Sequence, residues 1–360
     1  MMIQYIVRRF FTAIPVLFGI LLVTFALARL IPGDPCRAIL GEKATKEVCD
    51  RFIHEKGLDK PIYVQFGVYM GEIARGDFGR SFRFGMPVTR LLIERLPTTV
   101  ELSISALLVS IIIGIPLGII SAVRHNSWVD VTTMVWANTG VSMPVFWLGL
   151  MLAYVFSLLL KDTPFWLPPS GRISPGIPSE AFYVVWGLTV PEKGFLLAVF
   201  QFLGRLNILN ALLTANWELL RDSITHLILP SLALGTIPMA LIARMTRSSM
   251  LEVLGQDYIR TARAKGLPKN TVVLKHAFRN SLLPLVTVIG LSLGSLLGGA
   301  VLTETIFGLS GVGRTLFEAI TARDYGIVQA FTVVIAVFFV ILNLLVDISY
   351  AYLDPRIRFD

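Results

Sequence analysis

A phosphate-binding loop is the first chemistry that the sequence suggests. The run Gly308-Leu-Ser-Gly-Val-Gly-Arg-Thr315 approximates the pattern G-x-x-x-x-G-K-[ST], in which backbone N–H groups and a lysine hold nucleotide phosphates. Here Arg314 takes the place of the lysine, and no strand pattern precedes the run. We therefore expect this chain to bind no ATP and no Mg²⁺, so that any energy from nucleotide hydrolysis must come from another protein.

Residues that could catalyse hydrolysis are scattered along the chain. The histidines lie at positions 54, 125, 226 and 276, and no His-Glu-x-x-His motif occurs that would hold zinc. No serine or aspartate pair has an evident base beside it. The sequence therefore predicts no catalytic residue, no cofactor and no metal site, and it disfavours an intramembrane hydrolase.

The segment 244–281 carries the strongest charge signal. It contains eight lysine and arginine residues against only Glu252 and Asp257, a net charge of +6. Because lysine and arginine accumulate on cytoplasmic loops of membrane proteins, we expect this segment to be a cytoplasmic loop.

Within this loop the sequence predicts a helix of about eight residues. Asp257 suits the N-cap, Gly266 suits the position after the C-cap, and Pro268 blocks continuation. So short a helix is marginal alone, so we expect another surface to hold it. Its small residues would fit a groove of a partner protein, and its basic residues would equally suit anionic headgroups. The candidate segment comprises Asp257, Tyr258, Ile259, Arg260, Thr261, Ala262, Arg263, Ala264, Lys265 and Gly266.

The elements that would position this loop are membrane spans. Of the 360 residues 54% are hydrophobic and 16% are charged, whereas a soluble domain carries about 25% charge. Two shorter apolar runs, 181–191 and 194–204, are not counted as crossings. The sequence therefore predicts an all-α integral membrane protein with six transmembrane helices. The six uncharged stretches are 10–28, 102–123, 131–160, 223–243, 281–303 and 325–346.

The charge distribution predicts the orientation. With segment 244–281 inside, six spans place both termini in the cytoplasm, and the nearly neutral segments 31–98 and 161–222 fall outside. The first stretch could instead be a signal peptide, but its 19 uncharged residues favour a retained anchor. The net charge of +8 then reflects contact with anionic lipid, and no pattern indicates nucleic-acid binding.

The two cysteines both fall in the first outside segment. Cys36 and Cys49 could form a disulfide in an oxidising exterior, or they could be two unrelated thiols.

Ionisable residues avoid the middle of every expected span. His226, Glu304 and Asp347 lie near span ends, where we expect water or headgroups to reach them. Ion-coupled carriers typically need acids or histidines near the midplane, so the sequence disfavours a secondary transporter. No residue can be assigned to a substrate path from the sequence.

The fifth span has one face almost without side-chain volume. Gly290, Gly294 and Gly298 recur every four residues, so backbones can approach closely there. This helix-packing seam could face a moving partner helix, or it could be ordinary intramolecular packing. Gly114 and Gly118 in the second span leave the same alternatives open.

Several longer motifs resemble one family. The run from Arg244 to Gly266, followed by His276-Ala-Phe-Arg-Asn280, resembles the cytoplasmic loop of the dipeptide/oligopeptide/nickel family of ABC importer permeases. Within that family the chain is most similar to the first permease subunit of dipeptide importers. Further motifs similar to the family are Ile31-Pro-Gly-Asp-Pro35, Gly57-Leu-Asp-Lys-Pro61, Gly76-Asp-Phe-Gly79, Leu96-Pro-Thr-Thr-Val-Glu-Leu102, Ser142-Met-Pro144, Leu283-Pro284, Thr303-Glu-Thr-Ile-Phe307 and Asn343-Leu-Leu-Val-Asp347.

The resemblance implies a type I ABC importer transmembrane subunit in the cytoplasmic membrane of a prokaryote. The helix at 257–266 would be the coupling helix that docks a cytoplasmic ATPase. The implied partners are a second homologous permease subunit, two ABC ATPase subunits that bind ATP and Mg²⁺, and an extracytoplasmic peptide-binding protein. The implied cargo is a dipeptide or short oligopeptide, moved by alternating access; nickel and glutathione importers of the same family remain alternatives.

The resemblance also implies a division of the chain. Residues 1–98 would form an N-terminal transmembrane helix with an external loop, and residues 99–355 would form the permease core of five transmembrane helices. That core would hold an external insertion at 161–222 and the coupling loop at 244–281. We expect the external segments 161–222 and 307–326 to receive the binding protein. One departure from related permeases is that Arg260, Thr261 and Ala262 occupy the place of Glu-Ala-Ala, which fits the peptide branch.

Overall fold

The computed structural model describes residues 2–30, 44–55 and 57–353. Within these residues the regular structure is helical, apart from one isolated β-bridge between Arg80 and Pro87. Cys36 lies outside the described residues, so the possible disulfide with Cys49 stays untested.

The long helices carry the apolar stretches. They are α1 (Met2–Leu30), α5 (Val88–Val123), α11 (Trp217–Leu254), α13 (Leu282–Gly299) and α16 (Tyr325–Leu353). Shorter elements connect or extend them. These are α3 (Lys46–Glu55), α4 (Ile62–Ala74), α6 (Trp128–Ser142), α7 (Val145–Ala153), the π-helical η1 (Tyr154–Leu159), α8 (Phe182–Val185), α9 (Phe195–Gly204), α10 (Asn207–Leu213), α12 (Asp257–Ala264), the π-helical η2 (Thr271–Ala277), the 3₁₀ turn η3 (Phe278–Ser281), α14 (Val301–Ile306) and α15 (Val312–Thr321).

The expected third span is broken. The chain bends by 99° between residues 128–142 and 145–159, at Met143-Pro144, because Pro144 has no N–H to continue the helix. A second pair, 195–204 with 207–213, bends by 89°. The described residues therefore contain five helices long and apolar enough to span a membrane, or up to seven if each bent pair forms one span.

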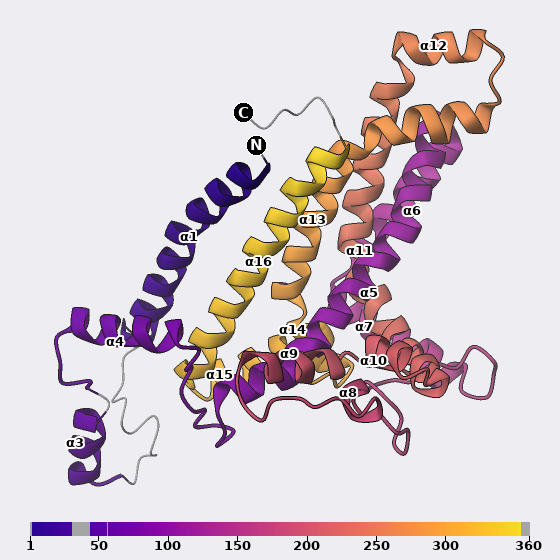
Figure 1. Cartoon of the computed structure of the whole chain (residues 1–360). Coiled ribbons are helices and arrows are strands. Elements are labelled where there is room, and N and C mark those ends of the chain that lie inside the picture. Colours follow the sequence, from indigo (N-terminus) through magenta and orange to yellow (C-terminus); the bar gives the residue numbers. More distant parts are fainter. Residues whose placement is uncertain (1, 31–43, 56, 354–360) are drawn as a thin grey trace.

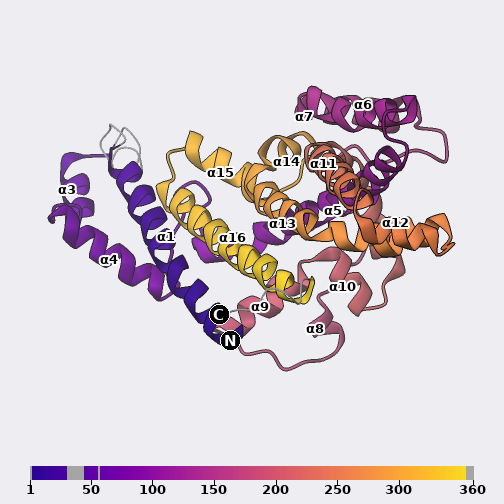
Figure 2. The same ribbon diagram turned by 90° about the horizontal axis from the view of Figure 1, so that it is seen from above.

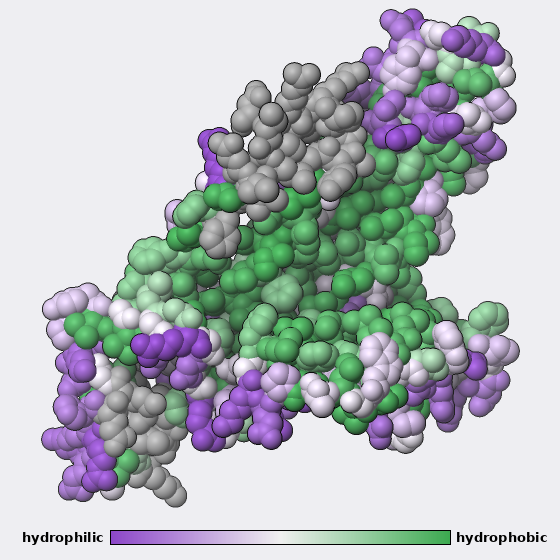
Figure 3. All heavy atoms as spheres, viewed as in Figure 1, coloured by the Kyte–Doolittle hydropathy of each residue, from purple (hydrophilic) through white to green (hydrophobic). Residues whose placement is uncertain are grey.

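The molecule has two hydrophilic ends and an apolar middle. Figure 1 places α12 at one end, together with the beginning of α1 and the end of α16, and places α3, α4, α8, α9, α10 and α15 at the other. Hydrophilic residues gather at both ends, with a band of apolar residues between them (Figure 3). This distribution matches a chain that crosses a bilayer several times.

The core is built on α5 and α11, which run side by side in the same direction. A Cβ on Gly235 would lie 2.7 Å from the Ala106 carbonyl oxygen, and a Cβ on Gly118 would lie 2.6 Å from that of Ala243. Only glycine permits so close an approach of two backbones. Seen from above, α5, α11 and α13 lie between α1 and the α6–α7 pair (Figure 2).

Two expected boundaries fall inside continuous helices. The division after residue 98 lies within α5, which already begins at Val88. The coupling loop expected from residue 244 begins with the last turns of α11, which continues to Leu254. The boundaries were placed where charged residues interrupt the apolar stretches, but the backbone hydrogen bonding of α5 and α11 continues past these residues.

Candidate functional site

The short basic helix exists and has the expected length. It runs from Asp257 to Ala264, so its eight residues agree with the sequence prediction. Its N-cap is Gln256, with extended backbone, and not Asp257 as expected from the sequence. Asp257 is already the first helical residue, where its charge favours the positive end of the helix dipole and pairs with Arg260 at 3.2 Å.

The helix ends as the sequence predicts, at a glycine in left-handed conformation. Gly266 has φ = +73°, and its N–H donates to the Arg263 carbonyl at 3.0 Å. The N–H of Leu267 donates to the Ala262 carbonyl at 3.3 Å, which completes a Schellman motif. A side chain at position 266 would be strained in this conformation.

One face of α12 is held by the chain itself. Ile259 and Ala262 are buried in a small cluster that also contains Met250 of α11, Val272 of η2 and Ala122 of α5. The sequence interpretation assigned Ala262 to a partner's groove, but only 8% of this residue is exposed, because it packs on its own loop.

The opposite face of α12 is open. Tyr258 is partly exposed, and its hydroxyl accepts a hydrogen bond from Asn280 Nδ2 at 2.9 Å. The remaining exposed residues of the segment are Asp257, Arg260, Thr261, Arg263, Ala264, Lys265 and Gly266. This face therefore combines short side chains with positive charge, as a docking surface for another protein would.

An ion pair joins α6 to α11, with its acid buried and its base partly exposed. Asp130, at the start of α6, accepts two hydrogen bonds from the Arg247 guanidinium of α11, at 2.8 and 2.7 Å. It also accepts from the N–H of Asn126 at 3.0 Å and from the Ser121 hydroxyl of α5. Such a bidentate pair fixes orientation as well as distance. We call this group the inner clamp, because it ties α5, α6 and α11 together near their α12 ends.

The inner clamp was missed in the sequence. Arg247 counted only as one of the loop charges, and Asp130 stood just outside an uncharged stretch. The available signal was Asp130 itself, a lone acid at the border of an apolar stretch and one helical turn after Ser127, a residue type that favours the N-cap. In the structure Ser127 is the N-cap of α6, and its hydroxyl accepts a hydrogen bond from the Asp130 N–H at 3.4 Å.

The loop that mimics a phosphate site holds a carboxylate of its own chain. Glu304 accepts hydrogen bonds from Thr99 Oγ1 at 2.6 Å and from the Arg314 N–H at 2.8 Å, at the start of α15. A side chain on Gly311 would overlap the carboxylate. The N-terminus of a helix attracts anions, and here the anion is intramolecular. The need to make room for the Glu304 carboxylate therefore explains the glycine at position 311, and no bound nucleotide has to be invoked.

Glu304 is less accessible than its position in the sequence suggests. We expected water to reach it, but none of its surface is exposed, since α5, α14 and α15 surround it. Burial raises the pKa of the Glu304 carboxyl, more than the hydrogen bonds from Thr99 and Arg314 lower it.

A third buried acid anchors the segment 161–222. Glu101 of α5 accepts from the Arg172 guanidinium and from the Ile208 N–H, the latter at 2.8 Å. Arg172 also donates to the Arg205 carbonyl at 2.8 Å. Thr99 and Glu101 both belong to the motif Leu96–Leu102, which the sequence offered only as a family signature. The structure shows that the motif pins α15 and α10 to α5.

The end of the molecule away from α12 carries further polar anchors. Asp222 of α11 accepts from both the N–H and the hydroxyl of Ser174, each at 2.7 Å. Asp324 accepts from Ser81 Oγ at 2.6 Å and from the Arg83 N–H at 3.1 Å. Segments far apart in the sequence are therefore fixed to one another at this end.

The glycine seam of α13 faces its own chain in part. A side chain on Gly290 would overlap Val346, and a Cβ on Gly294 would lie 2.5 Å from the Phe339 ring, both residues of α16. Gly298 has nothing within 4 Å of such a Cβ. The first two glycines thus serve intramolecular packing in this structure, whereas Gly298 faces open space.

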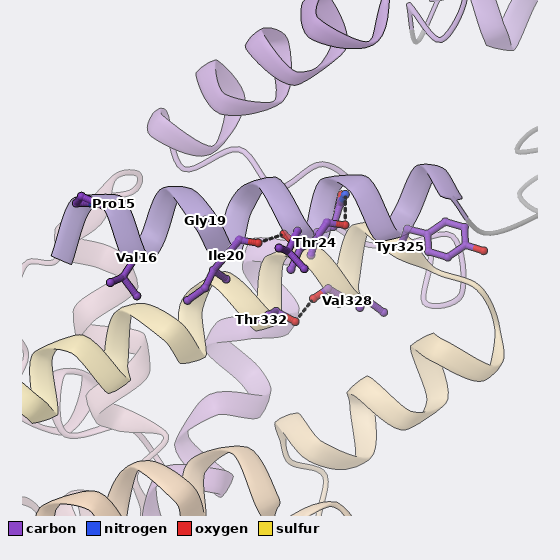
Figure 4. Close-up of a pocket in the computed structure, with 10 residues that line it drawn as sticks. Pro15, Val16, Gly19, Ile20, Thr24, Tyr325, Val328 and Thr332 are labelled. Atoms are coloured by element: carbon purple, nitrogen blue, oxygen red, sulfur yellow. Dashed lines mark hydrogen bonds between the residues drawn. The ribbon is translucent and has the colours of Figure 1, made fainter. Parts of the chain in front are cut away.

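A groove of about 530 Å³ lies between α1 and α16 (Figure 4). Its lining is mainly apolar, and the hydroxyls of Thr24 and Thr332 donate to carbonyls of their own helices, Ile20 and Val328. Because it offers a hydrophilic cargo few free polar groups, it does not resemble a peptide path. Among the described residues, no three His, Cys, Asp or Glu side chains come together as a metal site would need.

Known proteins are similar in sequence to this chain over nearly its full length. Residues 114–359 match the family described as binding-protein-dependent transport system inner membrane component, and residues 2–103 match its N-terminal family. A dipeptide transport system permease protein of Alkalihalophilus pseudofirmus is 47% identical, covering 99% of this chain and 100% of the relative. The corresponding protein of Escherichia coli is 43% identical over 99% of both chains.

A relative named for a longer cargo is also similar. An oligopeptide transport system permease protein of Bacillus subtilis is 38% identical, covering 99% of this chain and 100% of the relative. The chain therefore belongs to the family of inner membrane components of binding-protein-dependent transport systems.

Proposed function

We propose that this chain is a permease subunit of an ABC importer that moves dipeptides and short oligopeptides across the cytoplasmic membrane of a prokaryote. The observation that carries the proposal is end-to-end similarity, at 47% and 43% identity, to relatives named dipeptide transport system permeases. The open face of α12 supports it, since a transport subunit driven by partner ATPases needs a surface on which they dock.

The proposed topology has six crossings, with both termini and α12 in the cytoplasm. We count the bent pair 128–159 as one crossing, because contacts fix its start and the segment that follows it toward opposite ends of the molecule. Asp130, at its start, belongs to the inner clamp. Beyond its end, the Gly171 N–H donates to the Phe307 carbonyl at 2.9 Å. The pair 195–213 is not counted, because α8, α9 and α10 all lie at the end away from α12 (Figure 1). The net +6 of segment 244–281 supports the orientation.

The proposed assembly contains a second, homologous permease subunit, two ABC ATPases that bind ATP and Mg²⁺, and an extracytoplasmic peptide-binding protein. The exposed residues of α12 would enter a cleft of one ATPase. The anchored external segments 161–222 and 307–326 would receive the binding protein. The division into residues 1–98 and a permease core at 99–355 stays part of this proposal.

The proposed mechanism uses α12 as a lever. Its start is joined to α11 through only Gly255 and Gln256, and α11 is locked to α5 by glycine contacts and to α6 by the inner clamp. A displacement of α12 by the closing ATPases would therefore move α5, α6 and α11 together. We infer that this motion opens the path outward and that ATP hydrolysis reverses it.

Reconstitution of the whole importer in liposomes tests the proposal. We expect uptake of a radiolabelled dipeptide that requires internal ATP and external binding protein, and that unlabelled short peptides inhibit. Nickel or glutathione uptake in place of dipeptide uptake would assign a different cargo within the family. Uptake driven by an ion gradient without ATP would contradict the proposal.

A further inference from the structure

The helices α8 and α9 expose a large apolar surface. Phe195, the first residue of α9, is 85% exposed, and Leu196 beside it is 52% exposed. Val184, Val185 and Trp186, at the end of α8, are each more than half exposed. α9 carries no charged residue, and both helices lie at the edge of the molecule (Figure 2). An exposed apolar patch of this kind marks contact with a partner protein or with a membrane.

The two helices form one packed unit. The ring centroid of Phe200 on α9 lies 5.9 Å from that of Phe182 and 5.9 Å from that of Tyr183, both on α8. A Cβ on Gly204 would lie 2.9 Å from the Ala181 Cβ, so the end of α9 also touches the start of α8. The inward faces are therefore occupied by packing, which holds the exposed apolar side chains on the outward face.

Contacts with α5 fix the depth of this unit. Arg205, directly after α9, pairs with Glu94 of α5 at 3.5 Å, and the Ile208 N–H donates to Glu101 of α5 at 2.8 Å. Glu101 directly precedes the uncharged stretch 102–123 of α5, which extends about 33 Å as a helix. That length matches the hydrocarbon thickness of about 30 Å, so the stretch begins at the edge of the hydrocarbon. The end of α9 is therefore anchored between this edge and about 12 Å beyond it, at the level of the headgroups.

We propose that α8 and α9 lie in the headgroup region of the outer leaflet, where Trp186, Phe195 and Leu196 contact phospholipid. The inference rests on the proposed topology, which places this end of the molecule outside the cytoplasm. Tryptophan is favoured at this depth, and a helix that lies in the membrane surface buries its apolar face about 5–10 Å into the boundary between headgroups and acyl chains. In Figure 3 the apolar band of the molecule reaches this level, so the exposed apolar side chains continue the lipid-facing surface of the spans.

Lipid fits this surface better than the binding protein does. A protein that docks and leaves needs polar groups around an apolar contact, since transient interfaces are about as polar as the rest of a protein surface. The only charged residues between positions 181 and 204 are Glu192 and Lys193, in the turn that joins the two helices, where both can reach water. Lipid contact would hold the outer end of α5 at a fixed depth while α12 is displaced at the other end.

Photo-crosslinking of the whole importer in liposomes tests this contact. The variant Phe195→p-benzoylphenylalanine places a photoreactive aromatic side chain at the start of α9, where the native ring is exposed. After irradiation, the intact mass of this chain should show a species heavier by one phospholipid. The exposed Glu47 of α3 supplies the control, because Figure 1 places α3 farther from α12 than α9 lies. Glu47→p-benzoylphenylalanine should give no such adduct.

Crosslinks from position 195 to the binding protein or to the second permease subunit, in place of lipid, would overturn the inference. Equal yields of lipid adduct at positions 195 and 47 would also overturn it. Dipeptide uptake by the same liposomes, measured before irradiation, separates this contact from the proposed function. Uptake without a lipid adduct at position 195 would overturn the lipid contact alone, whereas the adduct without ATP-driven uptake would support the contact and count against the proposed transport.

Discussion

Three carboxylates, Glu101, Asp130 and Glu304, are buried and each receives several hydrogen bonds from distant segments. Removing water from a carboxylate is costly, so such a group persists only where donors replace the water. In each case the donors come from elements that the chain must bring together: α10, α11 or the start of α15. Single acids therefore determine how these elements meet, although none of them performs a reaction.

The pKa of Glu304 leads to a prediction about pH. Since burial raises this pKa above the ordinary value of 4.5, the folded chain binds the proton more tightly than the unfolded chain. The resulting stability is fully present below the unfolded pKa and is lost as the pH rises through the folded pKa. We compare the melting temperature of the native chain with that of the Glu304→Gln variant. We expect the native chain's advantage over the variant to increase as the pH is lowered from about 8 to about 4.5.

A nearby glutamate supplies the control for this measurement. Glu318 on α15 is partly exposed and pairs with Arg314 at 3.0 Å, so the Glu318→Gln variant sets the background change with pH. A difference for Glu304→Gln that stays constant, or that shrinks on acidification, would contradict the assigned direction of the pKa shift.

At the scale of elements, the glycine contacts between α5 and α11 predict which substitutions disturb the bundle. A Cβ on Gly118 would lie 2.5 Å from Thr246 Cβ, whereas one on Gly298 would meet open space. We expect Gly118→Ala to destabilise the purified chain by about 1–3 kcal/mol. Gly298→Ala should be neutral or stabilising by up to about 1 kcal/mol, because alanine favours helices. Unfolding in mixed detergent micelles measures both; similar destabilisation by the two variants would refute the contact.

The two faces of α12 predict different effects from one substitution. Ala262 is buried in its own loop and Ala264 is exposed two residues later. We expect Ala262→Leu to loosen α12 in the isolated chain, seen as faster hydrogen exchange at residues 257–264, because the small cluster cannot hold a larger side chain. Ala264→Leu should leave that exchange unchanged but weaken ATPase binding in a pull-down. Equal hydrogen-exchange rates at residues 257–264 in the two variants would show that packing of Ala262 within its own chain does not hold α12 in place.

Local signals in the sequence predicted α12 and its terminal Gly266, because caps and glycines act within a few residues of the chain. The start of α5 was placed at Leu102 instead of Val88, because Glu94, Arg95 and Glu101 interrupt the apolar stretch. The two acids are tolerated because distant residues pair with them: Arg205 pairs with Glu94, and Arg172 pairs with Glu101. Pairing between residues far apart leaves no local pattern, so the Glu94–Arg205 and Glu101–Arg172 pairs could not be predicted from one sequence.

On the scale of the whole molecule, the polar anchors are unevenly distributed. Glu101, Asp222, Glu304 and Asp324 all fix segments at the end away from α12. Near α12, the inner clamp of Asp130 and Arg247 holds α5, α6 and α11. A firmly tied outer end and a lever at the other suit a subunit that receives cargo on one side and force on the opposite side. This interpretation requires that the two ends lie on opposite sides of the membrane.

Two exposed threonines test that requirement. Thr163, after η1, donates to the Leu160 carbonyl and accepts from the Phe165 N–H, and Thr261, on α12, donates to the Asp257 carbonyl, so both bond only to backbone groups nearby in the sequence. Each can therefore become cysteine in a Cys36→Ser/Cys49→Ser background with little structural effect. We expect a membrane-impermeant maleimide to label Thr163→Cys in intact spheroplasts and Thr261→Cys only after permeabilisation, because segment 244–281 carries the net +6 that retains loops in the cytoplasm. Retained dipeptide uptake by the cysteine-free background serves as the control. Labelling of Thr261→Cys from outside would reverse the orientation and remove α12 from reach of any cytoplasmic ATPase.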